Sequence, residues 1–280
     1  MILYKYAPLD GHTVENLRDS KLYFNIRENF NDPFDIYPKL DIEKEREPLL
    51  SALKKDLMYK YSPEFIETID TLSDEEIFNT FHQKYTYNES STKYGITCFS
   101  KIRGNILMWS HYADKHSGIC MGFEIDEDDK CLKNFLDNDR NAKFLSDNNA
   151  CKLFPIKYVD NNERPDFTFK EVRTENNDFM YKILSTKYKE WSYEQEVRIM
   201  VGNDKQGIFP AQIYYQPQRL KEIIFGARTS DEDISKVFKV LKPLPCFDLI
   251  SFAQAKLNRY NYVLDIEPIS KDESKLTKLK

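Results

Sequence analysis

The sequence predicts an α+β fold, a single domain with a mixed or antiparallel sheet core and a helical insertion at about residues 42–90. Three observations favour this class. Short apolar strand candidates bounded by turn residues recur along the chain, helical periodicity is concentrated in one segment, and no repeat or Pro/Gly/Ser-rich linker divides the sequence. With 280 residues, 41% of them hydrophobic, the chain is long enough for one large domain or two small ones. We expect one domain over residues 1–270, followed by a basic tail at 271–280.

The first half of the chain alternates short strands with helices. A short helix at Thr13–Asp19 separates two predicted strands, Leu3–Tyr6 and Leu22–Asn25. From Ile42 to about Asn88 the spacing is helical, with one apolar stripe formed by Leu49, Leu50, Leu53, Leu57 and Tyr61. Ser73 followed by Glu76 predicts a capping box that opens the next helix. The following elements are a strand at Gly95–Ser100, a helix at Asn105–His116, a strand at Gly118–Ile125 and a polar loop at Asp137–Asn149.

The second half contains the clearest strand alternation. In Trp191–Val201, apolar residues project from one face, and Glu194, Glu196 and Arg198 project from the other. The remaining predicted elements are strands at Lys152–Val159, Leu220–Phe225, Phe247–Phe252 and Tyr262–Glu267, and helices at Asp178–Lys189 and Ser230–Leu241.

Composition narrows the function classes. The chain has eight glycines, whereas average usage would give roughly twenty in this length. No GxGxxG or GxxxxGK[ST] motif occurs, so a glycine-dependent nucleotide-binding loop is not expected. The net charge of −5 disfavours a non-specific nucleic-acid coat. The five cysteines include no CxxC pair and indicate a reducing compartment. Neither a signal peptide nor an apolar stretch of about 18 residues is visible, so we expect a cytoplasmic protein with no membrane partner.

The segment Phe30–Asp35 (FNDPFD) combines strong turn-forming residues. Asn and Asp side chains cap their own backbone and Pro fixes φ, so a tight turn is expected, anchored on a core by the flanking phenylalanines. Two interpretations remain open. The turn is either purely structural, or it places Asn31 and Asp32 at the rim of a pocket.

A second cluster, MWSHYA at Met108–Ala113 with His116, puts aromatic and histidine side chains on one helix. Trp109, Tyr112 and His116 are neighbours at i, i+3 and i+4 spacing, whereas His111 points elsewhere. Such a helix can wall a pocket for a flat ligand such as a nucleobase or a nicotinamide ring, and core packing is the alternative. The two histidines lack the spacing of HExxH, so no metal is expected.

The third cluster is Trp191–Arg198 (WSYEQEVR). One carboxylate of the Glu194 and Glu196 pair can hold a sugar hydroxyl or stabilise an oxocarbenium-like centre, while the other orients or deprotonates a nucleophile. The alternative is a solvated strand face with a surface ion pair, worth about 0–1 kcal/mol.

Four segments together resemble a bacterial family of unknown function, the domain family numbered 2971. They are LYKYAPL, LYFNIRENFNDPFD, CFSKIRGNILMWSHYADKHSGICMGFEI and LSTKYKEWSYEQEVRI, and they span Leu3 to about Met200. The family label implies no activity.

A looser resemblance links the same segments to ADP-ribosyltransferases. Glu194-Gln195-Glu196 is similar to the E/Q-x-E motif of those enzymes, and Cys98–Ser100 stands where their middle-strand motif belongs. The first strand departs from their pattern, with Lys5 and Tyr6 in place of Arg or His. The resemblance implies a split sheet and NAD bound as a substrate without a glycine loop.

It also implies roles for individual residues. Glu196 would hold the ribose 2′-hydroxyl and stabilise the transition state, and Glu194 would position the acceptor. Trp109, His111 or Tyr112 would stack on the nicotinamide. Arg198 would contact the cofactor or simply neutralise the two carboxylates. The other expected cofactor contacts are Tyr6, Asn31, Asp32 and Ser100. The implied activity is ADP-ribosyl transfer or NAD cleavage, in a toxin or phage-defence effector.

Two other classes compete with this hypothesis. One is a non-catalytic nucleotide-sensing or protein-interaction module of a bacterial defence system. The other is a metal-dependent nuclease that uses Asp32, Asp35 and Glu196, for which no compact acidic motif is present. A small-molecule nucleotide is the expected ligand, while the acceptor (protein or nucleic acid) and the oligomeric state stay open.

Overall fold

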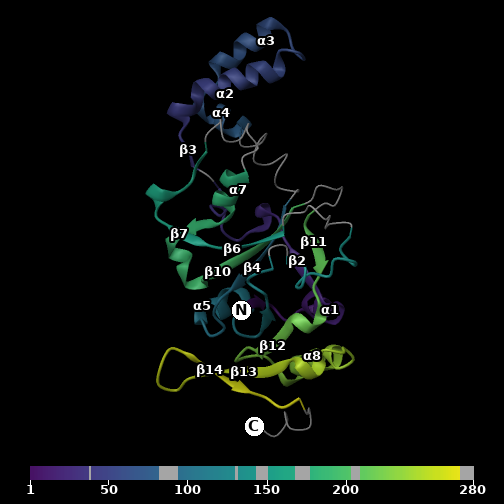
Figure 1. Ribbon diagram of the computed structural model, residues 1–280. Coiled ribbons are helices and arrows are strands. Elements are labelled where there is room, and N and C mark those ends of the chain that lie inside the picture. Colours follow the sequence, from purple (N-terminus) through teal and green to yellow (C-terminus); the bar gives the residue numbers. More distant parts are fainter. Residues whose placement is uncertain are drawn as a thin grey trace. The chain divides into compact units, whose positions relative to one another are not determined.

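The computed structural model describes residues 1–37, 39–81, 94–129, 132–142, 151–167, 177–202 and 209–271, and confirms the α+β class (Figure 1). The chain divides into two compact units, each assembled from separate stretches. The first comprises Met1–Asn25, Gly95–Ile156 and Glu190–Lys280, and the second comprises Ile26–Tyr94 and Lys157–Lys189. The helical segment expected at 42–90 belongs to the second unit. Residues 82–90 of that segment and 272–280 of the expected tail lie outside the described residues.

The first unit is built on an eight-stranded mixed sheet of order β14-β13-β12-β5-β1-β4-β10-β6. Its strands are β1 (Ile2–Ala7), β4 (Tyr94–Ser100), β5 (Ile119–Glu124), β6 (Cys151–Pro155), β10 (Glu196–Gly202), β12 (Leu220–Phe225), β13 (Ser251–Leu257) and β14 (Leu264–Pro268). β12 and β13 are parallel, whereas β1 is antiparallel to both of its neighbours. A separate antiparallel pair joins β2 (Lys21–Phe24) to β11 (Ala211–Tyr214).

The sheet is nearly divided between β1 and β4. β1 pairs with β5 at six successive positions, but its described pairing with β4 is the single position Tyr4↔Ser100. Further along β4, Ile96 forms a bridge to Asn25. The two strands therefore separate beyond Tyr4 and Ser100, which leaves a split between β1 and β4 within the one sheet.

Helices and aromatic side chains fill the first unit. The helices are α1 (Gly11–Asp19), α5 (Ile106–Tyr112) and α8 (Asp231–Leu241), with N-cap side chains from Asp10, Asn105 and Ser230. These caps satisfy amide groups that the first helical turn leaves without partners. α5 contributes Met108 and Trp109 to a buried cluster with Tyr6 and Cys120.

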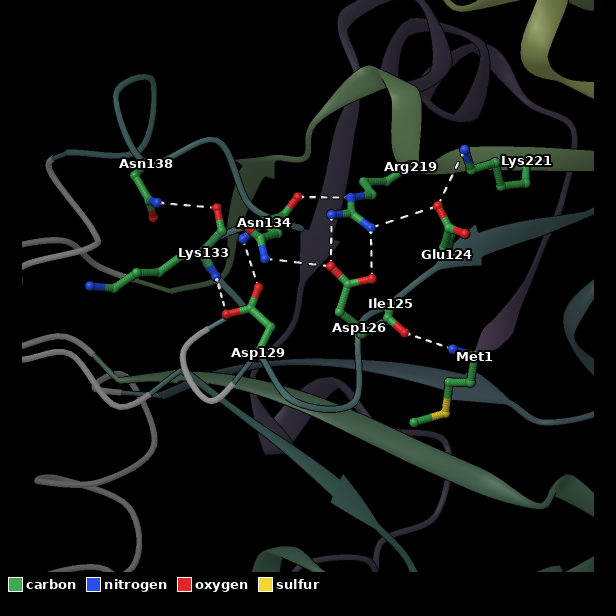
Figure 2. Close-up of polar contacts among 10 residues, drawn as sticks. All are labelled: Met1, Glu124, Ile125, Asp126, Asp129, Lys133, Asn134, Asn138, Arg219 and Lys221. Carbon is green, nitrogen blue, oxygen red and sulfur yellow. Dashed lines mark hydrogen bonds and ion pairs between the residues drawn. The ribbon is translucent and has the colours of Figure 1, made fainter.

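A polar network ties the loop after β5 to the start of β12 (Figure 2). The Arg219 guanidinium donates two hydrogen bonds to the Asp126 carboxylate, at 3.0 and 2.8 Å, and a third to the Asn134 carbonyl at 2.9 Å. At the chain start, the Met1 amino group donates to the Ile125 carbonyl at 2.8 Å. Bidentate arginine pairing restricts geometry more than a single ion pair does, so this network fixes the loop.

The second unit is helical, with two short parallel strand pairs. Its helices are α2 (Ile42–Leu57), α3 (Pro63–Thr68), α4 (Asp74–Phe81) and α7 (Asn177–Leu184), and its pairs are β3 (Lys39–Leu40) with β8 (Asp166–Phe167) and β7 (Lys157–Val159) with β9 (Thr186–Tyr188). Leu49 and Leu53 of the predicted stripe are buried, but Tyr61 is 51% exposed and its assignment to the stripe is wrong. The capping box is confirmed, because Ser73 and Glu76 exchange hydrogen bonds.

Four predicted elements end or begin well away from the expected residues. The expected helix Asn105–His116 stops at Tyr112, so His116 lies in the turn after α5, and its expected place on the helix beside Trp109 and Tyr112 is wrong. The expected helix Asp178–Lys189 stops at Leu184 and gives way to β9 and then to a 3-10 helix, η5 (Lys189–Glu194). The expected strand Lys152–Val159 is two strands, β6 in the first unit and β7 in the second. Phe247–Leu249 is a 3-10 turn, and the strand begins only at Ser251. None of the helices in the described stretches is long and apolar enough to cross a bilayer.

We predict that the variant Gly226→Ala is destabilised, since an added Cβ at this position would lie 2.1 Å from the His116 carbonyl oxygen. Overpacking against backbone costs roughly 1–3 kcal/mol or more. A matched glycine, Gly11, has nothing within 4 Å of its added Cβ and begins α1, so Gly11→Ala should be neutral or slightly stabilising. Urea denaturation of both variants measures the difference, and equal stabilities would contradict this packing.

Candidate functional site

Glu194 and Glu196 are withdrawn from water rather than displayed on a solvated strand face. Their side chains are 3% and 4% exposed, and that of Arg198 is 1% exposed. The predicted alternation is wrong for residues 191–195, which form the end of η5 and a left-handed residue, Gln195 at φ 44°. It holds from Glu196 onward, where β10 begins. Glu194 therefore reaches the interior from the 3-10 helix and Glu196 from the strand.

Arg198 and Glu196 lie two residues apart on β10, and their side chains are joined by two hydrogen bonds. Arg198 Nε donates to Glu196 Oε1 at 2.6 Å, and Arg198 Nη2 donates to Glu196 Oε2 at 3.2 Å. Because alternate residues share a strand face, the two side chains lie side by side. A buried charge is tolerated when it is paired and hydrogen-bonded, so each group requires the other. The prediction that Arg198 neutralises a carboxylate is confirmed for Glu196.

Glu194 is held by α5 and β4. Tyr112 of α5 donates its hydroxyl proton to Glu194 Oε1 at 2.6 Å, and Ser100 of β4 donates to the Glu194 backbone carbonyl at 2.6 Å. Asn105, which caps α5, also donates to the Tyr193 carbonyl at 3.1 Å. These bonds connect the helix, β4 and η5 around the two carboxylates.

A half-buried lysine, Lys5, and a half-buried thiol, Cys98, lie close to the acidic pair. The Lys5 ammonium donates to the Cys98 carbonyl at 3.2 Å and lies 5.5 Å from the centre of the Phe99 ring. Burial lowers the pKa of Lys5, while the electrostatic influence of the Cys98 and Glu196 side chains opposes that shift. Burial, reinforced by the Glu196 charge, raises the pKa of the Cys98 thiol well above its ordinary range. Cys98 is therefore kept as a neutral thiol.

The aromatic residues of this region differ in exposure. Trp109 is fully buried, donates its indole proton to the Arg103 carbonyl at 2.9 Å and meets the Tyr6 ring edge-on at 5.3 Å. Tyr6 is 8% exposed and its hydroxyl donates to the Ile102 carbonyl. Tyr112 is half-buried, and His111 is exposed. His111 and Tyr112 are therefore the more accessible of these four rings.

Asn31 and Asp32 belong to the second unit, whereas all the other predicted site residues belong to the first. The expected turn is present. Asp32 is 9% exposed and its Oδ1 accepts a hydrogen bond from the Phe34 amide at 2.8 Å. Phe34 is 67% exposed, so the expectation that it anchors the turn on a core is wrong. Asp35 instead forms a buried ion pair with Lys187, at 3.5 Å.

Sequence reasoning assigned no role to Lys5 or Asn105. Neither residue is part of a recognisable sequence motif. Lys5 on β1 contacts the Cys98 carbonyl on β4, and Asn105 contacts the Tyr193 carbonyl from the N-cap of α5. An Asn directly before a helical pattern was the available signal for the cap. Among the described residues, no group of three or more His, Cys, Asp or Glu side chains is arranged to hold a metal ion.

Comparison with known proteins supports part of the predicted resemblance. Residues 108–199 match the model of DUF2971, a protein family of unknown function. The match includes Tyr112, Glu194, Glu196 and Arg198, but it begins after β1, the FNDPFD turn and β4. Searches of curated proteins and of solved structures found no match.

We predict that Glu196→Gln destabilises the protein by about 3–5 kcal/mol, because it removes the negative charge that pairs at two points with the buried Arg198 guanidinium. The double variant Glu196→Met/Arg198→Met should recover most of that loss, since apolar side chains need no partner. Asp126→Asn is the control, because it breaks a bidentate pair that is partly exposed and should cost only about 1 kcal/mol. Urea denaturation provides the comparison, and a double variant no more stable than the single one would contradict this account.

We also predict that Cys98 reacts slowly with iodoacetamide at pH 8.5 in the folded protein, because only the thiolate reacts and its pKa is raised. Glu196→Gln removes a negative charge next to the thiol and should accelerate the reaction, whereas Asp126→Asn should not. Mass spectrometry of the peptide containing Cys98 gives the rates. Faster alkylation of Cys98 than of the denatured chain would show that the thiol is not held neutral.

Proposed function

We propose that this protein cleaves NAD and transfers the ADP-ribosyl group, with Glu194 and Glu196 as its acidic pair. The observation that carries this proposal is the burial of both carboxylates, each held by a different partner, beside the split between β1 and β4. A surface ion pair has neither property. A preorganised carboxylate in a water-excluded site stabilises positive charge far better than one in water.

The roles follow from the contacts. Arg198 fixes the orientation of the Glu196 carboxylate, which would face the positive charge that develops at the anomeric carbon as nicotinamide leaves. Tyr112 fixes Glu194, which would orient the acceptor hydroxyl or water. The exposed His111 and the half-buried Tyr112 would flank the nicotinamide ring. A chain with eight glycines would bind the nucleotide through rings and carboxylates.

A second function, a protein-interaction module, is favoured by one feature of the β13–β14 hairpin. Leu257, Tyr260 and Tyr262 near its tip are 73%, 91% and 97% exposed. Exposed aromatic side chains often anchor interfaces. This surface is compatible with catalysis elsewhere in the first unit.

The decisive test is nicotinamide release from NAD by the purified protein, measured by chromatography. We expect release by wild type and at least about a hundredfold loss in Glu196→Gln, because the lost group stabilises the transition state. Glu194→Gln should weaken transfer while keeping the fold, since a glutamine oxygen can still accept the Tyr112 hydrogen bond.

Asp126→Asn is the matched control, because it breaks another arginine–carboxylate pair of the same unit and should leave release unchanged. Circular dichroism at the assay temperature confirms that each variant is folded. Undiminished release by folded Glu196→Gln, or no release by wild type with any acceptor, would refute the proposal.

A further inference from the structure

The turn between α5 and β5 has an unusual backbone. Asp114, Lys115 and His116 have φ values of 44°, 52° and 73°, three successive non-glycine residues in the left-handed region. Such residues are uncommon, and they persist where the surrounding structure fixes them. Strain of this kind points to a residue whose position matters.

The backbone of His116 is fixed on both sides. Its amide donates to the Trp109 carbonyl at 3.2 Å, and its carbonyl accepts from the Arg228 amide at 2.9 Å. The absence of a side chain at Gly226 permits this close approach, because a Cβ there would collide with the His116 oxygen. The turn therefore holds the His116 ring at a defined place beside α5.

At this place the His116 ring lies next to a serine hydroxyl. His116 Nε2 lies 3.0 Å from Ser110 Oγ, and Ser110 is exposed on α5. Burial, followed by the nearby Arg228 charge, lowers the pKa of His116, so the imidazole is neutral at pH 7 and able to accept a proton. His116 Nδ1 is buried and has no hydrogen-bond partner in the described part of the chain.

We propose that Ser110 is a nucleophile activated by His116, a site of covalent acyl transfer that is independent of the acidic pair. Ser110 Oγ attacks the carbonyl carbon of a small carboxylic ester while its proton passes to His116 Nε2. The bond from that carbon to the leaving oxygen breaks, and the leaving alkoxide takes the proton from His116. The products are an acylated Ser110 and an alcohol.

The arrangement favours a slow, accumulating adduct. In a catalytic triad a carboxylate stabilises the imidazolium through Nδ1, and this Nδ1 has no such partner among the described residues. Regeneration of the free hydroxyl by water needs the same proton acceptor, so it is slow as well. Ser110 therefore acts as a site that is modified once rather than as an efficient hydrolase.

The test is acylation by p-nitrophenyl acetate, with the acetylated residue located by mass spectrometry. We expect acetyl-Ser110 in wild type, at least about tenfold less in His116→Asn, and none in Ser110→Ala. Asparagine tolerates the left-handed conformation, so the turn should survive. His12→Asn, at an exposed histidine of α1, is the matched control and should acylate Ser110 at the wild-type rate.

A second variant separates proton transfer from a structural role. His116→Gly adopts the left-handed backbone readily and removes the ring, so added imidazole should restore acylation of Ser110. Unmodified Ser110 in wild type would overturn the proposal. Equal modification in folded His116→Asn, or no rescue of His116→Gly by imidazole, would overturn it as well.

Discussion

The buried pair of Glu196 and Arg198 is the constraint on which the rest of the first unit depends. Two charges taken out of water are stable only with close geometry, and β10 provides it by placing both side chains on one strand face. The charge of Glu196 also acts on Lys5 and Cys98. It opposes the lowering of the Lys5 pKa and raises the pKa of the Cys98 thiol, which stays neutral. The sheet is covered here on both sides, so every residue of β10 is buried.

Left-handed residues organise the site around that pair. Gln195, at φ 44°, ends η5 and begins β10, which lets neighbouring glutamates approach the interior from two different elements. A second left-handed stretch, Asp114–His116, forms the turn that follows α5 and leads into β5. Both turns use non-glycine residues, in keeping with a chain of eight glycines, and tertiary hydrogen bonds hold them in place.

The sequence was sufficient for the fold class, for most strands of the large sheet and for the capped helices, because these follow from period and local capping. β12 lies where a short apolar run predicted it, and α8 lies where the capping residue Ser230 and an amphipathic pattern predicted it. The sequence was not sufficient where tertiary contacts determine a structure that differs from the local hydrophobic pattern. The alternation of Trp191–Tyr193 concealed a 3-10 helix, and the charged face of β10 concealed burial, because a covering layer has no local signal. The pairing of His116 with Ser110 depends on three left-handed residues that no propensity predicts.

The central claim is that the acidic pair forms a ligand site rather than a purely structural ion pair. The most direct measurement is the shift in thermal unfolding temperature on adding NAD, since a ligand that binds only the folded state stabilises it by RT ln(1 + [L]/Kd). We predict a rise for wild type and for Asp126→Asn, and a smaller rise for folded Glu196→Gln, each measured against the same variant without NAD. No shift for wild type with NAD, ADP-ribose or any nucleotide, or an undiminished shift in folded Glu196→Gln, would contradict it.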